Sequence, residues 1–103
     1  MCHHRLMPEV YLRAVRWVAD EPQPGIVECR LLDADGVEHV FIEKTAMFDD
    51  DNRLRPDASY PIELKHTCCV ISEGDTDLVI ELDCGIESVQ GQRAFRVSRS
   101  SIA

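Results

Sequence analysis

Apolar and polar residues alternate along most of the chain, which is the pattern of strands that bury one face. Residues 26–32 and 37–43 alternate in this way, and the letters "DADG" between them predict a tight hairpin turn. Two further runs, 61–72 and 78–84, are separated by "EGDTD", and a last short run covers residues 93–98. The pattern therefore predicts an antiparallel sheet built largely from consecutive hairpins.

The alternation also assigns the inward face of each strand, because a shift of one residue moves every side chain to the opposite face. In the later strands, the residues assigned to the core are Ile62, Leu64, His66, Cys68 and Val70, then Leu78, Ile80, Leu82 and Cys84, and finally Phe95 and Val97. The glutamates Glu28, Glu43, Glu63 and Glu81 fall on faces that we expect to be exposed to solvent. A general acid–base role for them is therefore not indicated.

Residues 9–20 fit either a helix or a strand. Tyr11, Ala14, Val15 and Val18 have helical spacing, and a proline before them suits a helix start. The β-branched and aromatic residues favour a strand instead. We predict a strand, because a lone helix would leave the first hairpin without a pairing partner.

The segment between the third and fourth predicted strands is irregular. Residues from Phe48 to Leu54 predict one or two helical turns, which Pro56 would end, and Phe48 and Leu54 are expected to fill one end of the sheet. An extra short strand at 86–90 is an option. The layout predicts an all-β fold, a small antiparallel barrel of five or six strands, OB-like or SH3-like, with a short helical plug. Such a layout implies no activity.

The length of 103 residues predicts one domain. We assign residues 1–8 to a flexible N-terminus, residues 9–99 to the β-barrel domain and residues 100–103 to a C-terminal tail. No apolar run is long enough for a membrane span, and the first residues lack the pattern of a secretory signal. Together with the odd number of five cysteines, this predicts a cytoplasmic protein with free thiols.

The acidic composition limits the classes of partner. With 19 acidic against 11 basic residues and a net charge of −8, binding to nucleic acid or to an anionic membrane is disfavoured. The six aromatic residues are few, and Trp17, Phe41, Phe48 and Phe95 are expected in the core rather than on a base-stacking surface. A protein partner, in particular a basic one, is compatible with the charge.

Cysteine and histidine residues suggest a metal site or a reactive thiol. Cys29, His39, His66 and Cys68 would form a zinc-binding set if they converged. They lack the paired spacing of zinc knuckles and occupy single positions within strands, so we interpret them as core residues. A reactive thiol would also need a nearby cation or a helix N-terminus, and the sequence around Cys68 indicates no helix N-terminus. Cys69 falls on the opposite face beside Lys65 and is expected to be the more exposed of the two, but we interpret it as a surface thiol rather than a catalytic one.

Two other segments contain residue types that can bind metal ions. His3 and His4, near the N-terminus, have a spacing that a square-planar Cu(II) or Ni(II) site uses, although a flexible terminus is the simpler interpretation. The acidic loop "FDDDNRLRPD" lacks the glycine and glutamate positions of a calcium-binding EF-hand loop. We interpret it as a partner-facing loop, and its carboxylates Asp49, Asp50, Asp51 and Asp57 are the candidate partner-binding residues.

One stretch carries a family resemblance. The run "DEPQPGIVECRLLDADGVEHVFIEKTAMF", Asp20 to Phe48, resembles small uncharacterised bacterial proteins of similar length, and the similarity extends to "SYPIELKHTCCVIS". The resemblance implies a compact bacterial cytoplasmic domain and adds no catalytic residues.

The sequence predicts a non-enzymatic, acidic protein-binding module that needs no cofactor, and an immunity-type protein is one such module. The first alternative is a small metal- or thiol-dependent protein using Cys29, His39, His66 and Cys68. The second is a structural domain that forms a homodimer through an exposed barrel edge.

Overall fold

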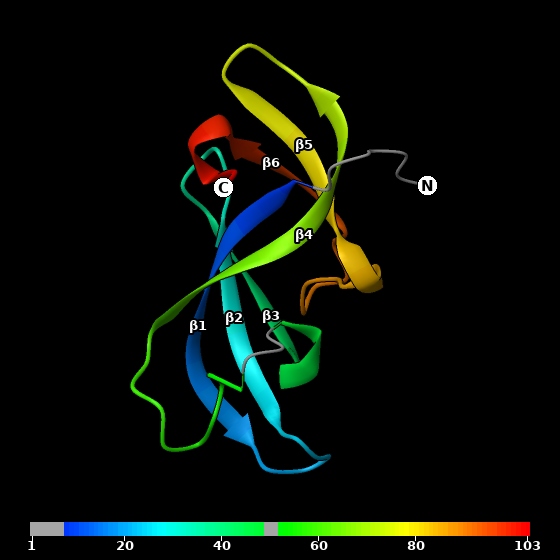
Figure 1. Ribbon diagram of the computed structural model, residues 1–103. Helices are drawn as coiled ribbons and strands as arrows, with labels where there is room; N and C mark the ends of the chain where they lie inside the picture. Colours follow the sequence, from blue (N-terminus) through cyan, green and yellow to red (C-terminus); the bar gives the residue numbers. More distant parts are fainter. Residues whose placement is uncertain (1–7, 49–51) are drawn as a thin grey trace.

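A computed structural model describes residues 8–48 and 52–103. It contains six strands: β1 (Glu9–Ala19), β2 (Ile26–Leu32), β3 (Glu38–Lys44), β4 (Ile62–Glu73), β5 (Asp77–Leu82) and β6 (Ala94–Ser98). Three single turns of 3₁₀ helix, η1 (Thr45–Met47), η2 (Asp83–Gly85) and η3 (Arg99–Ser101), are the helical elements of the described residues. The strands form one antiparallel sheet in the order β3-β2-β1-β4-β5-β6 (Figure 1). The predicted all-β class is confirmed.

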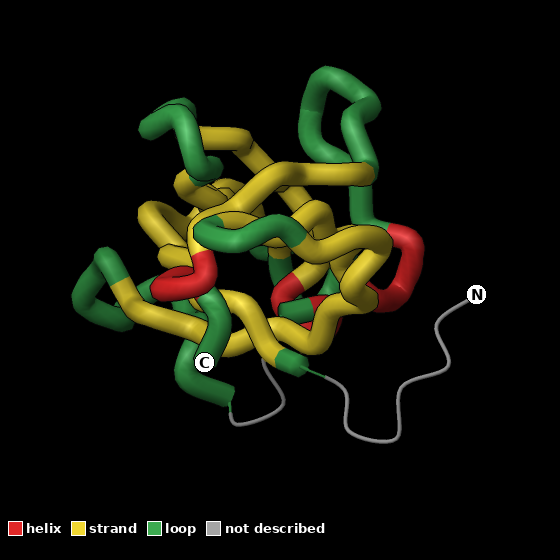
Figure 2. Tube along the Cα trace, turned by 90° about the horizontal axis from the view of Figure 1, so that it is seen from above, coloured by secondary structure: helices red, strands yellow, loops and turns green. Residues whose placement is uncertain are grey.

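The sheet curls into a half-barrel whose end strands, β3 and β6, approach one another. The ring centroids of Phe41 on β3 and Phe95 on β6 lie 5.5 Å apart, edge to face. The N–H of Ala34, in the β2–β3 turn, donates to the carbonyl oxygen of Arg96 over 2.8 Å. Seen from above, the strands run around an incomplete ring (Figure 2). The two ends therefore meet through a turn and aromatic side chains rather than through a strand ladder.

The optional strand at residues 86–90 is not present. The Ser88 hydroxyl accepts hydrogen bonds from the backbone N–H groups of Gln90 and Gln92, over 3.3 and 3.1 Å, and so holds the chain in a turn. The N–H of Val89 still donates to the carbonyl oxygen of Val40 on β3 over 2.8 Å. This segment therefore lies against part of the β3 edge without extending the sheet.

The strand predicted for residues 9–20 is confirmed as β1. Val10, Leu12 and Ala14 are buried on its inner face, and β1 pairs with both β2 and β4. Trp17, expected in the core, is instead half-buried and lies against Gly25, where a Cβ atom would come within 2.2 Å of the indole ring. Only glycine leaves room for that ring.

The core follows the predicted alternation closely. Buried residues of the last three strands are Leu64, His66, Cys68, Leu78, Ile80, Leu82, Phe95 and Val97. Cys84 is an exception, because it lies in η2 with a positive φ of 69° and is exposed. Phe48 and Leu54 are buried, as predicted for the plug. Its helical turn is η1, which comes before Phe48, and residues 52–54 are not helical.

The residues assigned to a C-terminal tail lie against β1. Ile102 forms an isolated bridge with Val10, and the N–H of Ala103 donates to the carbonyl oxygen of Glu9 over 2.8 Å. The chain end thereby pairs with the first residues of β1, which come before the ladder with β2 begins at Arg13.

Strand β4 changes partner along its length. Residues 62–67 pair with β1, whereas the ladder with β5 begins at Cys68, which pairs with Leu82. In the described part of the chain, the first half of β4 thus has a neighbouring strand on one side only.

Candidate functional site

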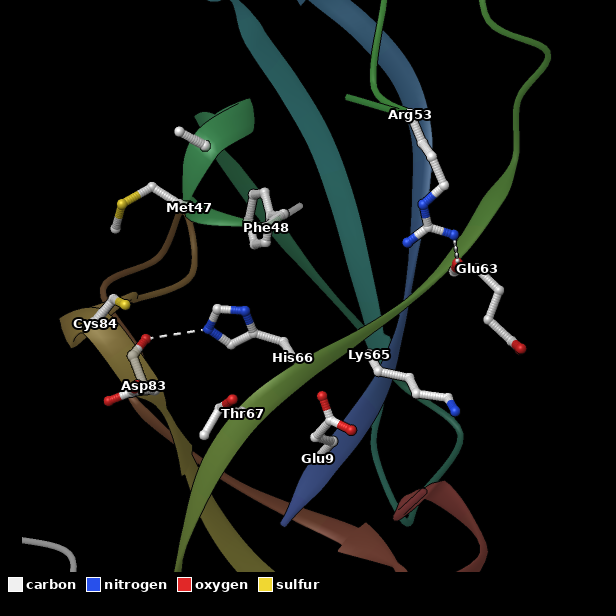
Figure 3. Close-up of a pocket in the computed structure, with 11 residues that line it drawn as sticks. Glu9, Met47, Phe48, Arg53, Glu63, Lys65, His66, Thr67, Asp83 and Cys84 are labelled. Atoms are coloured by element: carbon white, nitrogen blue, oxygen red, sulfur yellow. Dashed lines mark hydrogen bonds between the residues drawn. The ribbon is translucent and has the colours of Figure 1, made fainter. Parts of the chain in front are cut away.

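A cavity of about 510 Å³ lies beside the first half of β4 (Figure 3). His66 and Thr67 reach it from β4, Phe48 follows η1, and Asp83 and Cys84 belong to η2. Its volume is within the range of cavities that hold ligands, roughly 300–1,000 Å³. Three segments far apart in sequence therefore converge where β4 has no second strand neighbour.

His66 projects from the inner face of β4 into this cavity, and only 7% of the residue is exposed. Its Nε2 lies 3.2 Å from the carbonyl oxygen of Asp83, and its ring meets the Phe48 ring edge to face at 5.9 Å. Since a carbonyl only accepts hydrogen bonds, Nε2 carries a proton, and in this tautomer Nδ1 is an acceptor. Among the described residues no group donates to Nδ1, so it is available to a ligand.

Cys84 lines the cavity from η2, and Met47 lines it from η1 (Figure 3). No hydrogen bond joins its thiol to His66, although both residues are described. A nucleophilic thiol is normally activated by a directly bonded base. The cavity is therefore lined by a thiol from η2 and an imidazole from β4 without the bonded pair that thiol catalysis uses.

The rim of the cavity carries three carboxylates and two cations. Glu9, Glu63 and Asp83 form no ion pair with any described residue. The Arg53 guanidinium donates to the Glu63 carbonyl oxygen over a long 3.5 Å, and the Lys65 ammonium lies 5.9 Å from the centre of the Tyr11 ring. Figure 3 shows the Lys65 side chain directed away from His66. The opening is consequently more acidic than basic.

Of the four cysteine and histidine candidates, only His66 lines this cavity. Cys29 and Cys68 are fully buried in the core. Burial, assisted by the negative charge of Glu28, raises the pKa of the Cys29 thiol to about 12. Nε2 of His39 lies 2.8 Å from a carboxylate oxygen of Asp33, in the β2–β3 turn.

The four candidates are not brought together. Within residues 8–48 and 52–103, no group of three or more His, Cys, Asp or Glu side chains is arranged to hold a metal ion. His3 and His4 lie outside the described residues, as do Asp49, Asp50 and Asp51. Asp57 is described: its side chain is 81% exposed and lies 3.8 Å from Arg55.

The expected exposure of Glu28 is wrong. Only 4% of the residue is exposed, and its carboxylate accepts from Arg16 over 2.7 Å and from Arg30 over 2.8 Å. Burial disfavours the charged carboxylate, but the hydrogen bonds from Arg30 and Arg16 outweigh it and lower the pKa of Glu28. A β-bulge between Ala14 and Arg16 places Arg16 opposite Glu28, and the alternation of the sequence does not reveal it.

Glu28 belongs to a larger set of charges on the outer face of β1, β2 and β3. Glu38 accepts hydrogen bonds from Arg13 over 2.7 Å and from Arg30 over 3.4 Å. These contacts join five residues, Arg13, Arg16, Glu28, Arg30 and Glu38, which we call the β1–β3 ion cluster. Every member of the cluster has an opposite charge within reach.

Comparisons with known proteins do not assign a family. The chain matches no protein-family model, and no curated protein or solved structure is significantly similar to it. The resemblance of residues 20–48 to small bacterial proteins stays a prediction. In the described part of the chain, no helix combines the length and apolar character needed to span a membrane.

Proposed function

We propose that this protein is a non-enzymatic binding module of a bacterial cytoplasm that recognises a basic protein partner through its acidic surface. A module of the immunity type, which neutralises a basic partner by covering it, has this chemistry. The observation that carries the proposal is the unequal use of charge: the arginines are mostly engaged within the molecule, and many carboxylates are not.

The arginines outside the β1–β3 ion cluster are also engaged. Arg93 pairs with Glu87, and Arg96 pairs with both Asp35 and Asp77. These internal pairs neutralise most of the described arginines.

Three carboxylates, at the end of β4, in the turn that follows it and near the end of β5, have no such partners. Glu73, Asp75 and Glu81 are exposed and make no ion pair with a described residue. With a net charge of −8, the unneutralised field is negative. Such a field accelerates encounter with a cationic partner and repels anionic ones.

The test is a binding measurement with two end-blocked octapeptides, one of alternating arginine and threonine and one of alternating glutamate and threonine. We expect the Arg–Thr peptide to bind at about 0.02 M salt and at least about tenfold more weakly at about 0.3 M, because salt screens the attraction. The Glu–Thr peptide should not bind. If neither peptide binds at low salt, or if both bind equally, the proposal is wrong.

Homodimer formation is the second candidate function, and the open ends of the half-barrel favour it. β3 and β6 each have one strand neighbour in the sheet, and unpaired strand edges are sites of strand pairing between chains. Light scattering of the purified protein tests this. A mass of twice 11.7 kDa that persists on dilution to micromolar concentration would support the dimer, and the monomer mass would exclude it.

A further inference from the structure

The unpaired half of β4 presents backbone groups to the cavity. In an antiparallel strand, both backbone groups of a residue point to the same side, and successive residues alternate sides. The N–H of Cys68 donates to Pro8, just before β1, over 2.9 Å, so the even-numbered residues of this segment face β1. The odd-numbered residues Glu63, Lys65 and Thr67 therefore face the other way, toward the cavity that they line.

Hydrogen bonds of the described residues agree with this assignment. The Glu63 carbonyl oxygen, on the cavity side, accepts from the Arg53 guanidinium and not from a strand. The backbone N–H and C=O of Lys65 have no partner among the described residues. A donor and an acceptor on one strand edge are the groups that a further strand would pair with.

The cavity provides space for such a strand. The edge from Glu63 to Thr67 is about 14 Å long at roughly 3.4 Å per residue. Arg53 lies at one end of it, and η2, with Asp83, lies at the other. A short extended segment therefore fits along β4 between these two boundaries.

The side chains around the edge indicate what kind of segment would fit. Alternate side chains of an added strand point to opposite faces of the sheet. Those on the inner face would meet the acceptor Nδ1 of His66, which favours a short hydrogen-bond donor such as a hydroxyl. Those on the outer face would lie beside Glu63, whose carboxylate favours a cation, whereas the Lys65 ammonium on the same face is directed to the Tyr11 ring on β1.

We infer that the basic partner is bound as an extended segment that adds a strand to the Glu63–Thr67 edge of β4, with cationic and hydroxyl side chains alternating along it. This inference rests on the proposed function and specifies where and how the partner binds.

The test uses amide hydrogen exchange, followed by NMR, with the Arg–Thr octapeptide at about tenfold excess over its Kd. In the free protein, the amides of Glu63 and Lys65 should exchange rapidly, whereas those of Leu64 and His66, directed at β1, should be protected. On adding the peptide, we expect exchange at Glu63 and Lys65 to slow by about tenfold, the limit set by the bound fraction at that excess. Leu64 and His66 provide the internal control, since their amides should not change.

Peptide N-methylation provides a matched control on the ligand. One variant peptide carries N-methyl groups on the backbone amides of all its arginines, and a second carries them on all its threonines. Both keep the charge of the parent peptide, and each loses the backbone donors along one of its two edges. We expect one methylated peptide to lose at least about tenfold in affinity and the other to bind within about threefold of the parent.

The outcomes separate the two proposals. Salt-sensitive binding of the peptide without protection of Glu63 and Lys65, or equal losses for both methylated forms, would overturn the added strand and leave the acidic module in place. No binding at low salt would overturn both. Protection of the same amides in the protein alone, increasing with protein concentration, would assign the edge to a second copy of the chain and would also overturn the inference.

Discussion

Two polar regions of the sheet contrast in how their groups are partnered. In the β1–β3 ion cluster, each charged side chain has an opposite charge, and Glu28 is covered by two guanidinium groups. Around the cavity, the carboxylates of Glu63 and Asp83 and the backbone of Lys65 have no such partners in the described part of the chain. A saturated set of charges can hold a fold together but offers little to a ligand, whereas an unsaturated rim offers hydrogen bonds and charge.

The first and largest difference is expected in thiol reactivity. Cys29 lies beneath the ion cluster, and at pH 8 a thiol with a pKa of about 12 is ionised in roughly one molecule in ten thousand. Cys84 is exposed at the cavity. With a maleimide reagent, we expect Cys84 to be modified at least about a thousandfold faster than Cys29, as measured by peptide mapping with mass spectrometry.

A matched variant and the peptide sharpen this measurement. The Cys84→Ser variant should lose the fast site and keep the slow one. The Arg–Thr peptide should slow the modification of Cys84, because that residue lines the cavity. Comparable rates for Cys29 and Cys84 in the folded protein would contradict the contrast between the two regions.

The second expected effect is on stability. Glu28→Gln removes the charge that satisfies Arg16 and Arg30, and we expect the free energy of unfolding to fall by about 2 kcal/mol. Chemical denaturation measures it. Glu21→Gln, an exposed position without an ion pair among the described residues, is the control and should change stability by less than about 0.5 kcal/mol. Peptide binding should survive in both variants, since neither residue lines the cavity.

The third expected effect is on peptide binding, with little change in stability. The double variant Glu63→Gln, Asp83→Asn neutralises two rim carboxylates, and we expect it to weaken binding of the Arg–Thr peptide by about tenfold at low salt. Its stability should change by less than about 1 kcal/mol, because both side chains are exposed. An affinity equal to that of the unmodified protein would show that the peptide binds elsewhere.

The smallest effect is the acid dependence of stability. The pKa of Glu28 is lowered by folding, so its contribution is fully present above its ordinary value of 4.5. As the pH falls through that value, the unfolded chain binds the proton first, and the stabilisation is lost progressively until the pH has passed the lowered folded pKa. The difference in unfolding free energy between the unmodified protein and Glu28→Gln should therefore shrink with acidity. A constant difference would assign the effect of the variant to something other than charge.

Alternation in the sequence predicted the strands and most of the core, because burial of one face imposes a period of two. Leu64, His66 and Cys68 lie on the face expected for them. The burial of Glu28 was not predictable in this way, since it depends on a bulge in β1 and on two long side chains that reach over from neighbouring positions. Such features arise from register, which only the assembled sheet defines.

The candidate site was predictable only in part. His66 was selected from its residue type, but its role depends on the cavity and not on the other cysteine and histidine residues. Asp83 and Cys84 reach the cavity because the chain leaves β5 in η2 with a positive φ at Cys84, a conformation that the sequence does not signal. The free edge of β4 depends on where the ladder with β5 begins. The alternating sequence of β4 continues without a break through that residue, Cys68, and so does not indicate it.

The partner change within β4 also has a kinetic consequence. The ladder that joins β1 to β4 connects residues about fifty positions apart, such as Leu12 and Leu64, whereas β2–β3, β4–β5 and β5–β6 are local hairpins. Closing so long a loop costs entropy before its contacts form, so this junction should set the speed at which the chain acquires its native state. Stopped-flow refolding of Leu64→Ala should accordingly show a slower refolding rate, whereas Val97→Ala, in a hairpin, should mainly accelerate unfolding.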